Sequence, residues 1–111
     1  MGMTYLQMDE VYLANQIYHK ALEQEPQNIE AMMGLAMSYQ KQNYDKKALS
    51  IYIKLLRLEP TNALAYSNIG NIYLNSGNYI MAIKAYRKAL KLDSNVAGAT
   101  AALEILGSDD V

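Results

Sequence analysis

The sequence predicts an all-α fold in which antiparallel helical hairpins follow one another as repeats. Shifting the 111-residue chain by 34 residues aligns identical side chains in three copies without a gap. Within each copy, apolar residues recur at three- and four-residue spacing, as amphipathic helices require. The identical columns are Tyr5, Tyr39 and Tyr73; Ala14, Ala48 and Ala82; Tyr18, Tyr52 and Tyr86; Lys20, Lys54 and Lys88; and Leu22, Leu56 and Leu90.

Helix-breaking and capping residues divide the copies into helices. Proline disfavours helical geometry in the residue before it, so Pro26 and Pro60 end the second helix of their copies. Asn28 and Asn62 can cap the helices that follow. Gly77 suits a left-handed turn with Asn78 as the next cap, and Asn43 and Asp45 take these roles one copy earlier. We expect helices at residues 1–7, 10–24, 29–41, 45–58, 63–75, 79–92 and 96–106.

These helices predict one domain over residues 1–106. Its parts are a partial repeat near 1–28, full repeats at 29–62 and 63–95, and a capping helix at 96–106. One face of the last helix holds the apolar residues Val96, Ala99, Ala102, Leu103 and Leu106. Residues 107–111 form a polar tail. Small residues at 2, 36 and 70, and alanines at 14, 48 and 82, should let paired helices approach closely.

Composition excludes several classes of protein. The chain has no cysteine, which removes disulfides and thiolate chemistry. No apolar run approaches the ~20 residues that span a bilayer, so membrane insertion is not expected. The start shows no secretory signal pattern. The compartment stays open between bacterial secretion, cytosolic and organellar roles, with the cytoplasm favoured. Net charges of −4, +7 and −4 over residues 1–40, 41–91 and 92–111 give acidic ends and a basic middle.

The repeated columns resemble the tetratricopeptide repeat. That pattern places a bulky residue, a leucine, a small residue and a tyrosine on the first helix, then an alanine, an aromatic residue and a proline. The matching residues are Met32, Leu35, Ala36, Tyr39, Ala48, Tyr52 and Pro60; then Tyr66, Ile69, Gly70, Tyr73, Ala82 and Tyr86; and, in the first copy, Gly2, Tyr5, Ala14, Tyr18 and Pro26. The resemblance implies a right-handed α-solenoid of about three repeats plus a C-terminal capping helix.

Two departures from the family pattern stand out. Asp45 occupies the place where an aromatic residue normally begins the second helix, with Tyr44 one position earlier, so this turn is expected to differ locally. The first helix of copy one also lacks its opening turns. The packing face of residues 10–24 should therefore be left uncovered.

The resemblance also implies a concave groove, lined by the first helix of each repeat, that receives a peptide ligand. The residues outside the packing stripes are expected to face it: Met3, Leu6, Met33, Met37, Gln40, Lys41, Leu64, Ser67, Asn68, Asn71, Leu74 and Asn75, with Gln7 and Glu30 beside them. Met33 and Met37 lie one turn apart, away from the packing stripe, and exposed apolar patches often mark binding. An amphipathic helix or an extended peptide with apolar anchors would fit. The alternative is that neighbouring helices bury these side chains, or that further repeats upstream cover some of them.

No catalytic or metal-binding pattern emerges, and no cofactor or enzyme activity is expected. His19 is the only histidine, and no paired base or nucleophile follows from its spacing. Eight cations on two second helices predict a basic convex surface, which we interpret as a solvated face or a contact for an acidic partner, not as a nucleic-acid site. These cations are Lys46, Lys47, Lys54, Arg57, Lys84, Arg87, Lys88 and Lys91.

One ligand class within the family is not expected. Some relatives clamp the acidic tail of heat-shock chaperones with cations and asparagines. The corresponding positions hold Met3, Gly34, Leu64 and Asn68, so the cations of a carboxylate clamp are missing.

Two functions of different classes follow. The first is a protein–protein interaction module that binds a peptide or helix as a scaffold or chaperone. The second is a structural module that forms a homo-oligomer through its open N-terminal end, since a repeat array needs neighbours to bury its helical faces.

Overall fold

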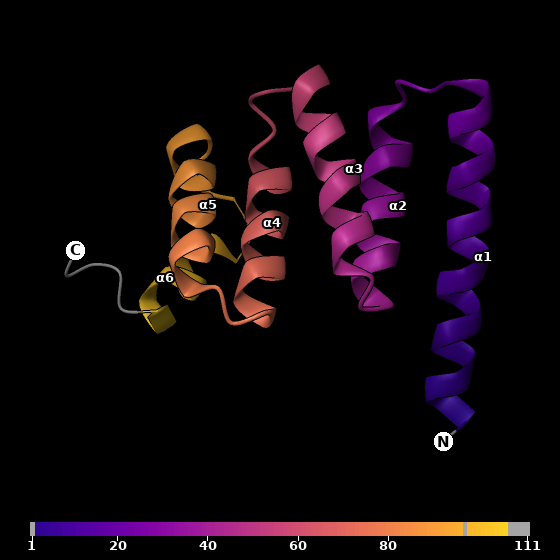
Figure 1. The fold of residues 1–111 in the computed structure, drawn as a ribbon, viewed down its shortest axis with the longest axis horizontal. Helices are drawn as coiled ribbons and strands as arrows, with labels where there is room; N and C mark the ends of the chain where they lie inside the picture. Colours follow the sequence, from indigo (N-terminus) through magenta and orange to yellow (C-terminus); the bar gives the residue numbers. More distant parts are fainter. Residues whose placement is uncertain (1, 97, 107–111) are drawn as a thin grey trace. The chain divides into compact units, whose positions relative to one another are not determined.

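The computed structural model describes residues 2–96 and 98–106, and residues 2–9 by their backbone alone. Over these residues the chain is all-α, as predicted (Figure 1). The helices are α1 (Gly2–Gln24), α2 (Ile29–Lys41), α3 (Asp45–Leu58), α4 (Ala63–Asn75), α5 (Tyr79–Leu92) and α6 (Ala99–Leu106). Two compact units divide the chain, Met1–Leu58 and Glu59–Val111, and each is described by itself. The predicted polar tail, residues 107–111, lies outside the described residues.

The boundaries of α2 to α5 agree with the predicted ranges because the expected breakers and caps act locally. The Asn28 side chain accepts a hydrogen bond from the Ala31 amide at 3.1 Å, and Asn62 does the same with Ala65 at 3.1 Å. Asn78 accepts from the Met81 amide at 3.4 Å. Both helices that precede a proline end two residues before it.

The two hairpin turns use a residue in the left-handed region. Gly77 has φ +83° and Asn43 has φ +64°, as the alignment of the copies predicted. The cap assigned to Asp45 was wrong, because Asp45 is already the first residue of α3. The Tyr44 carbonyl accepts from the Ala48 amide at 3.0 Å, which puts Tyr44 at the capping position. Asp45 instead places a negative charge in the first turn, where the helix dipole favours it.

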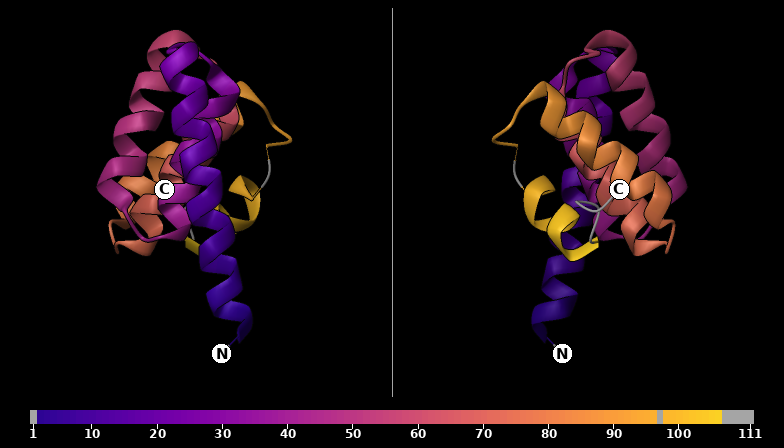
Figure 2. Two further views of the ribbon diagram at one scale, coloured as in Figure 1. Left: turned by 90° about the vertical axis from the view of Figure 1, so that its right-hand side faces the viewer. Right: turned by 90° about the vertical axis from the view of Figure 1, so that its left-hand side faces the viewer.

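The predicted break after residue 7 was also wrong, because α1 runs without interruption from Gly2 to Gln24. Figures 1 and 2 show its N-terminal part extending past the ends of α2 and α3. The residue aligned with Asn43 and Gly77 is Asp9, which lies within α1. A helix limited to residues 2–7 would bury too little surface to hold a hairpin closed, so continuing the helix is the better solution.

In the first unit, α2 packs against both α1 and α3. The predicted stripe on α2 is buried at Met32, Leu35 and Ala36, and that on α3 at Ala48, Tyr52 and Leu55. The Tyr18 ring of α1 lies over the backbone of Gly34. A Cβ at position 34 would come within 2.2 Å of this ring, so only glycine leaves room for it.

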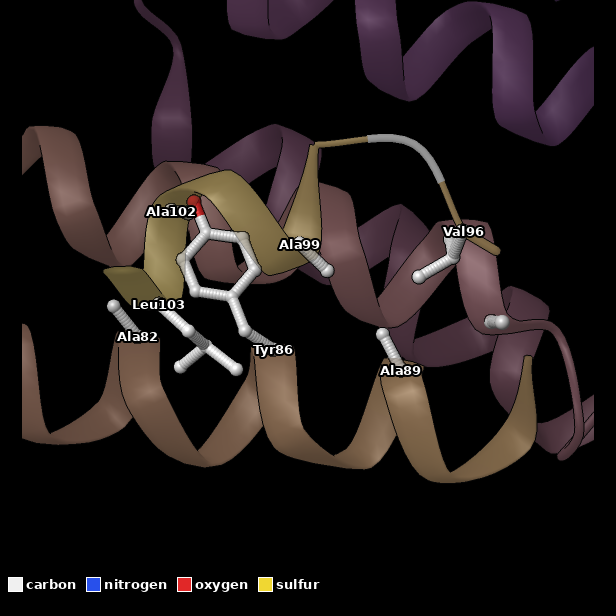
Figure 3. Packing of buried hydrophobic residues seen from close by; sticks show 8 residues of the cluster. Ala82, Tyr86, Ala89, Val96, Ala99, Ala102 and Leu103 are labelled. Atoms are coloured by element: carbon white, nitrogen blue, oxygen red, sulfur yellow. The ribbon is translucent and has the colours of Figure 1, made fainter. Parts of the chain in front are cut away.

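In the second unit, α5 packs against α4 and α6, and a core of small residues surrounds Tyr86. Figure 3 shows the Tyr86 ring beside Ala99 and Ala102 of α6. The helix α6 begins at Ala99, three residues later than predicted, after Gly98 with φ +80°. The apolar face of α6 is confirmed, because Ala99, Ala102 and Leu103 are buried and Leu106 packs against them; Val96 is buried too, but it precedes the helix.

Close approach within the α4–α5 hairpin depends on Gly70. A Cβ built there would lie 2.7 Å from Cε1 of the fully buried Tyr86 ring. The Tyr86 hydroxyl donates a hydrogen bond to Asn71 of α4, and the equally buried Tyr52 of α3 donates to Gln40 of α2. Each second-helix tyrosine therefore fills its hairpin and ends on a polar group of the first helix.

We expect Gly70→Val to lower the free energy of unfolding by about 1–3 kcal/mol, because the added side chain must displace a buried ring. The midpoint of urea unfolding measures this. Lys84→Val, at an exposed position of α5, is the control for placing a β-branched residue in a helix without a buried contact, and it should cost only about 0.5 kcal/mol. Equal midpoints for the two variants would show that the glycine contact does not limit the packing.

We expect Tyr86→Phe to destabilise the chain by about 1 kcal/mol near neutral pH, through loss of the hydrogen bond to Asn71. Burial raises the pKa of the Tyr86 hydroxyl. The folded state therefore keeps this proton at a pH where the unfolded state, with a pKa of about 10, has lost it. The stability that Tyr86 provides is complete below about pH 10 and falls above it. Urea midpoints of both proteins should converge as the pH rises past this value, and a constant difference would contradict the assignment.

Candidate interaction surfaces

The predicted binding face of α2 is partly open. Met37 is 40 % exposed and Lys41 is exposed, whereas Met33, one turn before Met37, is half-buried. Gln40 is half-buried and accepts the hydrogen bond of Tyr52. The α2 face, which we define as Met33, Met37, Gln40 and Lys41, thus combines one accessible apolar side chain with an exposed cation and with Gln40, which is anchored to the core.

Only some of the α4 residues that are predicted to line the groove are exposed. Leu64 and Asn75 are exposed, and Asn68 is half-buried. Asn71 accepts the hydrogen bond of Tyr86. The remaining two residues are not where the prediction put them.

Ser67 and Leu74 belong to the packing of the second unit. Ser67 is 1 % exposed, and Leu74 packs against the apolar core of this unit. Serine is small enough to lie in a contact between helices, and Leu74 lies one turn beyond Gly70 on α4. Sequence spacing alone therefore did not distinguish these packed positions from surface positions. The side chains of Met3 and Leu6 lie outside the described residues.

The clearest open surface is the packing face of α1. In the second and third copies, three aligned columns of the second helix are fully buried: Ala48, Tyr52 and Leu55 on α3, and Ala82, Tyr86 and Ala89 on α5. The aligned residues of α1, Ala14, Tyr18 and Ala21, are only half-buried. Beside them Ile17 is 65 % exposed, whereas the aligned Ala85 is buried. Among the described residues, the α1 face, defined as Ala14, Ile17, Tyr18 and Ala21, is therefore covered on one side by α2 and has no first helix of its own copy to cover it further.

A pocket of about 320 Å³ lies between α1, the end of α2 and the start of α3. The sequence analysis did not identify it. Its residues from α1 recur every three or four positions along that helix. They lie beside the turn that contains Tyr44, a residue that the sequence analysis treats only as a departure from the family pattern. The pocket is lined by Tyr12, Asn15, Gln16, His19, Tyr39, Gln42, Tyr44 and Lys47.

Aromatic rings organise this tyrosine pocket. The Lys47 ammonium lies 5.6 Å from the centroid of the Tyr39 ring and 5.2 Å from that of Tyr44, within the range of cation–π attraction. The His19 Nε2 atom is hydrogen-bonded to the Tyr39 hydroxyl at 3.0 Å. Asn15 donates to the Gln42 side chain at 3.2 Å. The Asn15 Oδ1 atom is buried and has no hydrogen-bond partner among the described residues.

The eight cations of the second helices are all exposed, as a solvated basic surface requires. Four of them lie on α3, where Lys46, Lys54 and Arg57 line a shallow depression together with Leu49, Ser50 and Ile53. Among the described residues, no group of three or more histidine, aspartate or glutamate side chains could hold a metal ion. No described helix is both long and apolar enough to cross a membrane.

Comparison with known proteins identifies the repeat. Models of the tetratricopeptide repeat match residues 31–64 and 63–96, which together make up more than half of the chain. No curated sequence matches the chain.

Solved structures share the fold. The first repeat domain of Spaghetti (RPAP3), bound to the HSP90 peptide SRMEEVD, is 23 % identical with a TM-score of 0.82, over 97 % of this chain and 86 % of that one. The repeat domain of Arabidopsis OM64 is 19 % identical with a TM-score of 0.84, over 97 % and 89 %. A repeat protein from Parabacteroides merdae is 26 % identical with a TM-score of 0.77, over 95 % of this chain and 41 % of its own.

The repeat columns, the buried tyrosines of the hairpins and the family matches agree. The fold class is therefore that of helical repeats closed by a C-terminal helix, and proteins of this kind serve generally as interaction scaffolds. The chain belongs to the tetratricopeptide repeat family.

Proposed function

We propose that the chain binds an amphipathic helix or an extended peptide through the α2 face. The observation that carries this proposal is the exposure of Met37 beside half-buried Met33. An unbranched thioether adapts to varied apolar partners, and an exposed apolar side chain gains free energy when a ligand covers it.

A polar side chain on the same helix as the methionine supports recognition of a peptide backbone. Gln40 is oriented by the hydroxyl of Tyr52. An amide anchored in this way loses little conformational entropy on binding, because the core already restrains it.

A carboxylate clamp is not part of this proposal. At one of the clamp positions Gly34 is covered by the Tyr18 ring, and even a Cβ there would come within 2.2 Å of it. Another such position holds Leu64, which brings no charge. The solved structure of similar fold that binds an HSP90 peptide therefore supports peptide binding in general. It does not indicate that this chain binds the same peptide.

We expect Met37→Glu to weaken peptide binding at least about tenfold, because a charge replaces the apolar contact. Peptides selected from a displayed library on the wild-type chain provide the ligand, and fluorescence titration gives the dissociation constant. Met81→Glu is the matched control, since Met81 is 37 % exposed on α5 and lies outside the α2 face. Circular dichroism should report the same helical content for all three proteins. Unchanged affinity in Met37→Glu would exclude the α2 face.

A second function, self-association through the α1 face, is favoured by the burial pattern of the repeat columns. Residues 2–7 repeat the columns of a first helix, with a small residue at 2 and a tyrosine at 5. Within continuous α1 they cannot fold back over residues 14–21 of the same copy. In an antiparallel pair of α1 helices, the first residues of each copy would cover the α1 face of the other, with two-fold symmetry.

We expect Ile17→Glu to abolish concentration-dependent association, because two such charges would be buried in each symmetric pair. Sedimentation velocity over a range of concentrations measures the association. Ile80→Glu is the matched control, since Ile80 is 70 % exposed on α5 and Ile17 is 65 % exposed on α1. A wild-type chain that stays monomeric throughout the range would exclude this function.

A further inference from the structure

The tyrosine pocket carries chemistry that the repeat does not require. Of its lining residues, Tyr39 alone belongs to a column that is identical in every copy. One copy later, the residues aligned with Tyr44, Lys47, His19 and Asn15 are Asn78, Met81, Ile53 and Leu49. None of these four aligned residues is a cation, an imidazole or an aromatic ring. The set is thus particular to this one place in the chain.

The charge of the pocket selects its occupant. None of the lining residues is acidic, and Lys47 makes no ion pair with the residues that the structure describes. The faces of Tyr39 and Tyr44 hold the ammonium group in place, which lowers the entropy lost when it binds an anion. A cationic occupant is disfavoured, because Lys47 already lies against both rings and would repel it.

The polar groups around Lys47 can form more hydrogen bonds than a free anion would use. The His19 ring and the hydroxyl groups of Tyr12 and Tyr44 can donate hydrogen bonds to a carboxylate. The buried Asn15 Oδ1 atom is an unpaired acceptor, and a small rotation of the amide would let it receive an N–H group. A peptide residue with an acidic side chain offers both a carboxylate and an amide N–H. The volume of about 320 Å³ fits one such residue rather than a large cofactor.

We infer that the tyrosine pocket binds an acidic side chain of a partner peptide. Lys47 and His19 contact the carboxylate, the tyrosine rings cover its methylene groups, and Asn15 accepts from the peptide backbone. The site is separate from the α2 face: Tyr39 follows Met37 by two residues, which places their side chains on opposite sides of α2. Failure at one site therefore leaves the other open to test.

The experiment is an NMR titration of the ¹⁵N-labelled full chain with a blocked peptide, N-acetyl-Ala-Glu-Ala-amide, at millimolar concentration. The glutamine analogue, acetate and inorganic phosphate are titrated in parallel. We expect the glutamate peptide to shift the side-chain amide signals of Asn15 and Gln42 and the backbone signals around Lys47. The glutamine analogue should produce shifts at least about fivefold smaller.

The variant Lys47→Met removes the cation and installs the residue that the aligned position carries at Met81, so the fold is preserved. It should lose the response to the glutamate peptide. Lys84→Met, exposed on α5, and Met37→Glu, on the α2 face, should keep it. Equal shifts from the glutamate and glutamine peptides, no shift at the pocket, or an unchanged response in Lys47→Met would each overturn the inference. Acetate or phosphate acting as strongly as the peptide would reduce the pocket to a general anion site.

Discussion

Each complete hairpin depends on a tyrosine of the second helix that is buried beside the first helix. In the α4–α5 pair the Tyr86 ring occupies the space left by the missing side chain of Gly70, and its hydroxyl ends on Asn71. In the α2–α3 pair Tyr52 is equally buried and ends on Gln40. The ring supplies apolar contact, and the hydrogen bond of its hydroxyl fixes how deeply the ring enters the hairpin. Both the spacing and the register of the two helices therefore follow from one residue type.

The candidate binding surfaces lie where this tyrosine packing is incomplete or where side chains take no part in it. On α1 the aligned Tyr18 has no first helix of its own copy and lies on Gly34 of α2 instead, which leaves Ile17 open. On α2 the side away from the packing stripe leaves Met37 accessible. Where α1 meets the α2–α3 turn, Lys47 and His19 converge on two tyrosines. Binding is thus expected at positions that the repeat itself leaves free to vary.

Much of this fold could be predicted from sequence, because the information is local and repeated three times. Proline, asparagine and glycine act within a few residues of their own position, so α2 to α5 were bounded correctly. The break within α1 was predicted wrongly, since helix ends also depend on whether a partner helix is present. Ser67 and Leu74 were misplaced because a face of an isolated helix does not show which neighbours cover it. The tyrosine pocket combines residues from three helices, and no spacing rule links Asn15 to Gln42 across the chain.

Amide hydrogen exchange at low protein concentration tests the central claim most directly, because it reports the opening free energy of each helix separately. If buried tyrosines hold the hairpins, amides near the centres of α3 and α5 should be the most protected. Those of α1 should then exchange at least about tenfold faster, since its packing face is only half-buried. Protection in α1 equal to that in α3 and α5, in a chain shown to be monomeric, would contradict the account.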